Sequence, residues 1–264
     1  MQTPPEVRLA NLAFMLFWMM AVAAILLAGR RWPRLRGFRD GMVAQWKPAL
    51  AIALLYLVSY ALSGRGFLNP YALAIFCQAL LGLALARRIA GYEPLPVAQS
   101  VVQRQHVWRS IGLMLGSAVL LALVAFLLGS IGMGVMQQIF GEVSRSAEAA
   151  SELPYNNWQL FFALLSGAGI AEETTYRLVA LSLLWKLTNR RWLAIVVSAL
   201  LFGAYHLSPL TSMYLTFWKF PLSQFLASSL IGLVWGYAYA RRGYETAVLS
   251  HTLSDWVPIL LFMR

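Results

Sequence analysis

The sequence predicts an all-helical, polytopic membrane protein with about eight transmembrane helices. Three observations lead to this fold class. Of the 264 residues, 60% are hydrophobic and 12% are charged, roughly half the charged fraction of a soluble domain. The mean hydropathy is +0.65. Apolar runs of about 20 residues, the length that spans a bilayer, recur from one end of the chain to the other.

Eight apolar segments follow one another along the chain, with turn-forming residues such as Asn69-Pro70 and Pro221 between several of them. The predicted spans are 9–28, 48–63, 70–86, 110–128, 158–185, 192–206, 221–240 and 246–263. The first span has the hydropathy of a signal peptide, but arginines follow it in place of a small-residue cleavage site. We therefore expect this span to be an uncleaved anchor.

The basic residues predict the orientation. With the N-terminus outside, four cytoplasmic loops hold fifteen Lys and Arg residues, and the outer loops and termini hold five. Such an excess in short loops marks the cytoplasmic side. We therefore expect a multi-pass protein with both termini outside, in the plasma membrane, or in the inner membrane if the chain is bacterial. The net charge of +11 then indicates contact with the lipid bilayer, and no nucleic-acid partner is expected.

A polar connector at 89–107 predicts a division into two parts. Residues 1–109 hold three transmembrane helices and this cytoplasmic connector, and residues 110–264 hold a five-helix unit. Segment 135–157 is expected to be an external loop because it carries three glutamates.

Two pairs of glycines are spaced to share a helix face. They are Gly112 with Gly116, and Gly232 with Gly236. Small residues at this spacing let two membrane helices approach closely, so both pairs predict close helix packing.

Ionisable side chains within the predicted spans are concentrated in the C-terminal unit. Such groups are costly in a bilayer and mark functional sites. The unit contains Glu172, Glu173, Arg177, His206, His251 and Asp255. Counted from the nearest basic residues at about 1.5 Å per residue, Glu172, His206 and Asp255 lie about 20–22 Å deep and His251 about 14 Å. Three helices therefore bring acids and imidazoles to a similar depth.

Helical spacing pairs several of these residues. Glu173 and Arg177 are four apart on one helix face, which predicts a buried salt bridge. His251 and Asp255 have the same spacing, and a carboxylate one turn from a histidine can orient its ring or stabilise its charged form.

These residues form three short motifs in order. Glu172-Glu173-Thr-Thr-Tyr-Arg177 resembles the EExxxR motif of the CPBP family, the CAAX protease and bacteriocin-processing family. Phe202-Gly-Ala-Tyr-His206 resembles its FxxxH motif, and His251-Thr-Leu-Ser-Asp255 resembles its HxxxN/D motif. The resemblance covers residues 158–256. It implies an intramembrane endopeptidase that acts on membrane-associated protein or peptide substrates.

The resemblance also implies a role for each motif residue. Glu172 would activate a water as general base, and His206 would help to hold that water. His251, joined by Asp255 if this acid is protonated, would stabilise the oxyanion; the eukaryotic-type CAAX enzymes carry Asn at the latter position. The supporting residues would be Glu173, Arg177 and Phe202. No cofactor is required on this interpretation.

Three alternatives remain open. Two histidines and a carboxylate are a known catalytic zinc ligand set, so Glu172, His206 and His251 form an alternative Zn²⁺ site; we favour the metal-free interpretation. A catalytically silent bacteriocin-immunity or scaffold protein would carry the same motifs. A proton-coupled transporter would also place acids and histidines in the membrane, but no interrupted helices occur in matching halves of this chain.

Overall fold

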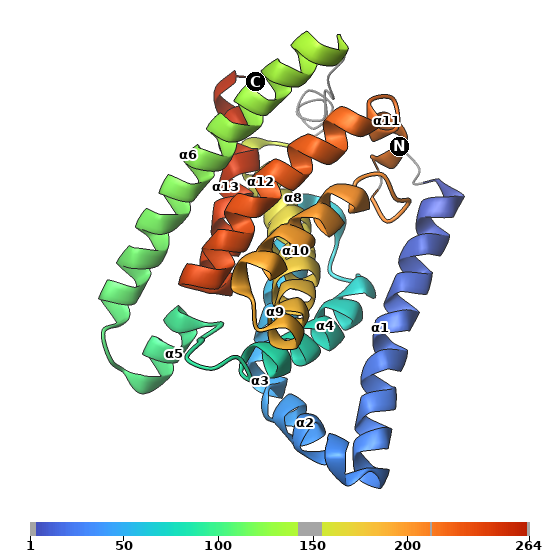
Figure 1. Cartoon of the computed structure of the whole chain (residues 1–264), viewed down its shortest axis with the longest axis vertical. Coiled ribbons are helices and arrows are strands. Elements are labelled where there is room, and N and C mark those ends of the chain that lie inside the picture. The colour runs from blue at the N-terminus through green and yellow to red at the C-terminus, as the bar shows by residue number, and fades with distance from the viewer. Residues whose placement is uncertain (1–3, 142–154, 212, 263–264) are drawn as a thin grey trace.

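The computed structural model describes residues 4–141, 155–211 and 213–262, and within these ranges every regular element is a helix (Figure 1). The predicted all-helical class is thus confirmed. The elements are α1 (Pro5–Arg31), α2 (Pro33–Ala44), α3 (Trp46–Tyr60), η1 (Ala61–Arg65), α4 (Tyr71–Ala86), α5 (Pro96–Gln103), α6 (Val107–Phe140), α8 (Asn157–Leu164), η2 (Leu165–Glu172), η3 (Thr174–Leu181), α9 (Ser182–Thr188), α10 (Arg191–Tyr205), α11 (Tyr214–Phe217), α12 (Pro221–Arg242) and α13 (Tyr244–Phe262).

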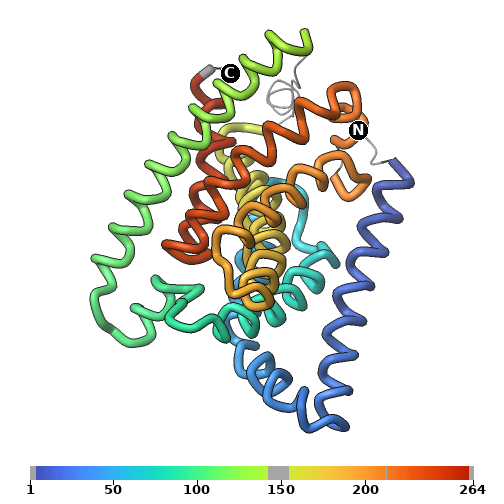
Figure 2. Tube along the Cα trace, viewed as in Figure 1, coloured from blue at the N-terminus to red at the C-terminus, as the bar shows by residue number. Residues whose placement is uncertain are grey.

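The helices α1 and α6 lie at opposite edges of the molecule, and the C-terminal helices lie between them (Figure 2). α1 contacts α2 and α4, whereas α6 contacts α12 and α13. α4 packs against both α3 and η3. One hydrophobic core accordingly joins Leu83 of α4, Leu178 of η3 and Tyr239 of α12. The N-terminal helices therefore support the segment that carries the EExxxR motif.

The surface of the two edge helices is apolar. α1 buries only Val7, Val22 and Gly29, and α6 buries only three alanines. Large exposed apolar faces of this kind require a partner or a lipid environment. Within the described ranges, three helices are long and apolar enough to cross a membrane, namely Pro5–Arg31, Trp46–Arg65 and Val107–Phe140. Tyr71–Ala86 and Arg191–Tyr205 are shorter apolar helices. The predicted number of about eight spans is not confirmed by this comparison of length and composition.

The helix α6 is longer than predicted. The span expected at 110–128 extends over the 34 residues of Val107–Phe140, which corresponds to about 50 Å against a hydrocarbon core of roughly 30 Å. Ile131, Val135 and Ile139 continue its apolar surface. The expected external loop at 135–157 is therefore wrong for its first six residues, and residues 142–154 lie outside the described ranges.

The predicted span at 158–185 is a run of four helical segments, α8, η2, η3 and α9, in which η2 and η3 have wide π-helical turns. Two side-chain hydroxyls occupy carbonyls of the preceding turn: Thr174 Oγ1 donates to Ile170 O at 2.6 Å, and Thr175 Oγ1 donates to Ala171 O at 3.0 Å. Such bonds compete with the regular backbone ladder. π-helical turns of this kind occur frequently at functional sites.

Of the two predicted glycine contacts, one is confirmed. A Cβ on Gly232 would lie 3.3 Å from Phe202, and one on Gly236 would lie 3.1 Å from Ile195, so α12 approaches α10 closely at both positions. The prediction for Gly112 and Gly116 is wrong, because no described atom would lie within 4 Å of a Cβ at either residue. These two glycines lie on a face of α6 that no other described helix covers closely.

Gly243 connects α12 to α13 with φ +86° and ψ 177°, a conformation that is essentially restricted to glycine. A Cβ there would also collide with Pro96. We expect Gly243→Ala to cost about 1–3 kcal/mol and to lower the thermal unfolding midpoint in detergent. Gly112→Ala is the matched control, since it places a methyl group in open space on a helix and should be neutral or slightly stabilising. Equal midpoints for both variants would show that the turn can relax.

The orientation stays a prediction that reporter fusions can test. Figure 1 shows the start of α1 and the end of α13 at the same end of the molecule, as two termini on one side of a membrane require. Fusions after Arg39, Arg88, Arg109, Arg191 and Arg242 should report the cytoplasm, and fusions at Arg65, Glu148 and Arg264 the outside. A cytoplasmic signal at position 148 would invert the C-terminal unit and contradict the predicted topology.

Candidate active site

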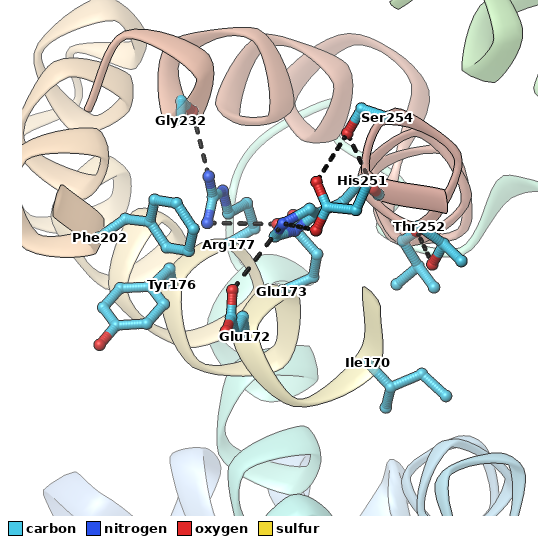
Figure 3. A network of polar contacts seen from close by, with 12 residues as sticks. Ile170, Glu172, Glu173, Tyr176, Arg177, Phe202, Gly232, His251, Thr252 and Ser254 are labelled. Atoms are coloured by element: carbon cyan, nitrogen blue, oxygen red, sulfur yellow. Dashed lines mark hydrogen bonds and ion pairs between the residues drawn. The ribbon is translucent and has the colours of Figure 1, made fainter. Parts of the chain in front are cut away.

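His251 of α13 lies at the centre of the three motifs (Figure 3). Its Nδ1 is 2.8 Å from Glu173 Oε1, and because a carboxylate accepts, Nδ1 donates. The other ring nitrogen, Nε2, lies 3.8 Å from Glu172 Oε2 and 3.6 Å from Asp255 Oδ2. Both distances exceed that of a hydrogen bond. Nε2 therefore faces two carboxylates without being bound to either.

Glu173 and Arg177 form the buried ion pair that their spacing predicted, with Nη1 3.2 Å from Oε1 and both side chains fully buried. Arg177 also donates from Nη2 to Gly232 O at 3.2 Å, which ties η3 to α12. Its guanidinium lies over the ring of Phe202 at 4.5 Å. Sequence analysis did not predict that Glu173 also binds His251, because spacing within one helix carries no information on contacts between helices.

Trp235 of α12 is a site residue that sequence analysis missed. Its ring is buried and stacks on the His251 ring, with centroids 3.4 Å apart and planes inclined by 20°. The Arg177 guanidinium lies 5.5 Å from the same ring. Together with the bond to Glu173, this stacking fixes the plane of the His251 imidazole. The one available signal was the position of this tryptophan between two packing glycines.

His206 at the end of α10 is close to the site but does not bind Glu172 directly in the described part of the chain. Its Nδ1 lies 2.9 Å from Phe202 O, and since a carbonyl only accepts, Nδ1 donates. The Phe202 ring contacts the rings of both histidines, with centroids 4.6 Å from His206 and 5.7 Å from His251. Phe202 therefore spaces the two imidazoles, and Nε2 of His206 is left as an acceptor.

Glu172 and Glu173 differ in solvent exposure. Its side chain is 18% exposed, whereas that of Glu173 is fully buried. Glu172 and Tyr205 line a polar cavity of about 290 Å³. The N-terminal part of the chain contributes the polar lining residues Asn11, Tyr56, Asn69 and Tyr71. Sequence analysis assigned no function to the first three helices, and polar residues within these apolar segments were the signal that it did not use.

The comparisons agree with the motifs. Residues 154–257 match the family model described as type II CAAX prenyl endopeptidase Rce1-like. This segment is similar to that family. The match confirms the resemblance to the CPBP and CAAX protease family and points to a CAAX-type, membrane-embedded protease. No curated protein and no solved structure matches the chain.

The matched segment contains α8 to α12 and the first part of α13, with every motif residue, whereas α1 to α6 lie outside the match. Among the described residues, no three His, Cys, Asp or Glu side chains are arranged to hold a metal ion. Phe202 lies against both histidine rings and contributes to the separation of the two rings. The alternative Zn²⁺ set of Glu172, His206 and His251 stays a prediction that metal analysis can test.

Proposed function

We propose that this chain is an intramembrane endopeptidase that hydrolyses peptide bonds of membrane-associated protein or peptide substrates with a water activated by Glu172. One observation carries the proposal: His251 is fixed by the buried Glu173 so that its Nε2 faces Glu172 and Asp255. The polar cavity at Glu172 offers access for water and substrate. The Rce1-like match supports a protease.

Glu172 is the proposed general base. It removes a proton from the water as the oxygen attacks the scissile carbonyl, and it then gives this proton to the leaving amine, so that the carboxylate is regenerated. Its partial exposure to the cavity and the absence of a hydrogen bond to His251 Nε2 leave the carboxylate available for that exchange.

His251 is the proposed oxyanion donor. With Nδ1 held by the Glu173 carboxylate, a protonated ring presents Nε2–H towards the space between Glu172 and Asp255. Glu173 is thereby a positioning residue, since a carboxylate partner orients a histidine and stabilises its cationic form. Asp255, if protonated, supplies a second donor beside Nε2. A donor already in place at the oxyanion contributes about 3–4 kcal/mol to lowering the barrier.

His206 is proposed to hold the attacking water. Since its Nδ1 donates to Phe202 O, a neutral ring leaves Nε2 to accept a hydrogen bond. This nitrogen can orient a water molecule that Glu172 then deprotonates, without a direct contact between the two side chains. The partners on this proposal are a membrane-associated substrate and the lipid bilayer, with no nucleic acid and no required cofactor.

The decisive experiment is cleavage of a peptide library by the detergent-purified full chain, with and without a chelator, together with a measurement of metal content. Metal-free protein that cleaves peptides equally well with and without chelator supports the glutamate mechanism. Activity that disappears in chelator and returns with Zn²⁺ supports the metalloendopeptidase. Folded protein that cleaves no peptide supports the silent immunity or scaffold alternative.

Asp255→Asn distinguishes the two states of this acid. If Asp255 donates a hydrogen bond in its protonated form, Asn retains both shape and donor, and we expect substantial activity with a flatter alkaline limb of the pH–rate profile. An ionised Asp255 would pair with a cationic His251 instead, and its loss would cost roughly 100-fold or more. Steady-state rates across pH decide between these results. A large loss that no pH restores would contradict the donor role.

A further inference from the structure

A second polar cavity, of about 490 Å³, lies where the connector before α5, the end of α12 and the start of α10 meet. It shares no lining residue with the cavity at Glu172 and none with the three motifs. Three arginines line it, Arg191 from the first turn of α10 and Arg241 and Arg242 from the last turn of α12. Two helices thus contribute three arginines to the lining of one cavity. The guanidinium groups of Arg191 and Arg241 also lie over the rings of Trp192 and Tyr237, at 5.5 and 5.9 Å.

The charge of this cavity is not balanced by acids. No ion pair joins any of the three arginines to an acid in the described ranges. The one carboxylate in the lining, Glu93, is paired with Arg87 and also accepts a hydrogen bond from Leu95 N at 3.0 Å. The nearby Glu245 accepts from the backbone of α5 and does not line the cavity. The guanidinium groups therefore create a positive field that no acid of the cavity neutralises.

The wall of the cavity is held by specific contacts. The ring of Tyr92 packs on Trp185 at 5.1 Å, and its hydroxyl donates to Tyr239 O at 2.7 Å. Tyr244 N donates to Pro94 O at 2.8 Å, which joins the connector to the turn between α12 and α13. Arg241 and Arg242 immediately precede this turn. The cavity is thus a built feature of the fold.

Basic residues at this face are expected from membrane orientation alone. Orientation, however, requires only charge in a loop, whereas here arginines from two helices line one cavity whose wall is held by specific contacts. Guanidinium groups match the geometry of phosphate oxygens and bind them by paired hydrogen bonds. Basic pockets between membrane helices are suited to phosphate-bearing headgroups. We propose that this cavity binds a phosphate-bearing anion.

The ligand can come from two sources. Leu113 and Met114 of α6 form an apolar wall of the cavity, and Leu113 is exposed on the outer surface of that helix. A lipid headgroup could therefore enter beside its own acyl chains. Free phosphate from solution would bind through the arginines alone, without the apolar wall. The two sources share one chemistry, and the probes below distinguish them.

The test measures binding to the full chain in neutral detergent by the shift of the thermal unfolding midpoint and by titration. The probes are short-chain phosphatidylglycerol, short-chain phosphatidylcholine and inorganic phosphate. The double variant Arg191→Gln/Arg242→Gln removes two of the guanidinium groups. Arg190→Gln is the matched control, because Arg190 is an exposed neighbour that does not line the cavity. The single variants Arg191→Gln and Arg242→Gln replace the double variant if it does not fold.

We expect phosphatidylglycerol or inorganic phosphate to stabilise the wild type and Arg190→Gln equally, and the double variant to bind roughly 20- to 30-fold more weakly. Stabilisation by the lipid alone identifies a headgroup, and stabilisation by inorganic phosphate identifies a free anion. Equal binding to all variants, equal effects of phosphatidylcholine and phosphatidylglycerol, or no binding of any probe would overturn the proposal. None of these measurements depends on proteolysis, so their outcome is separate from that of the protease mechanism.

Discussion

Glu172→Gln is expected to abolish measurable proteolysis while the protein stays folded. Gln retains the shape of the side chain and its position beside His251, but it cannot accept the proton of the attacking water. Loss of a general base typically reduces the rate roughly 10²- to 10⁴-fold. The measurement is turnover of a peptide identified with the wild-type enzyme, and the thermal unfolding midpoint in detergent is recorded for the same samples.

Asp40→Asn is the control for this experiment. Asp40 is an exposed carboxylate of α2 paired with Arg39, and its neutralisation removes one negative charge far from the motifs in sequence. We expect its turnover to equal that of the wild type. Wild-type turnover by Glu172→Gln would instead exclude Glu172 as the base, and the proton acceptor would then have to be sought among the other groups of the site.

Arg177→Ala is expected to reduce folding yield and stability severely. The substitution leaves Glu173 as an uncompensated buried charge, which typically costs about 3–5 kcal/mol. It also removes the hydrogen bond to Gly232 O and the contact with the Phe202 ring, so η3 loses its connection to α12. Expression yield in membranes and the thermal unfolding midpoint measure the effect. Arg190→Ala, at an exposed position, is the control and should change neither.

A double variant separates the structural role of the pair from its effect on His251. Glu173→Gln/Arg177→Met removes both buried charges together, and such replacement of a whole pair is often neutral in stability. We expect it to recover much of the stability but little activity, because His251 Nδ1 loses its carboxylate partner. Normal stability with lost activity in Arg177→Ala itself would contradict the structural role and place Arg177 in the chemistry.

The parts of the fold that the sequence predicted well are those that depend on local composition. The helical segments at 70–86, 192–206 and 221–240 correspond closely to α4, α10 and α12, because breakers such as Pro70 and Pro221 bound uniformly apolar runs. The length of α6 was underestimated, since the three glutamates of segment 135–157 suggested a loop, although apolar residues continue at helical spacing as far as Phe140. The π-helical turns were not predicted, since they depend on hydroxyl-to-carbonyl bonds and on packing against α4.

The site likewise has features that follow from the local sequence and features that depend on contacts between helices. The sequence by itself determined which residues are candidates, because an ionisable group in an apolar span has a high cost and stands out without any structure. It also determined the Glu173–Arg177 pair, whose partners are one turn apart on the same helix. Only the tertiary structure decided that Glu173 binds His251, that Trp235 stacks on this ring, and that Phe202 lies against both imidazoles. The physical reason is that these contacts join different helices. Their geometry depends on how the packed core fixes the rotation and the depth of each helix. The spacing of residues along one helix specifies neither quantity.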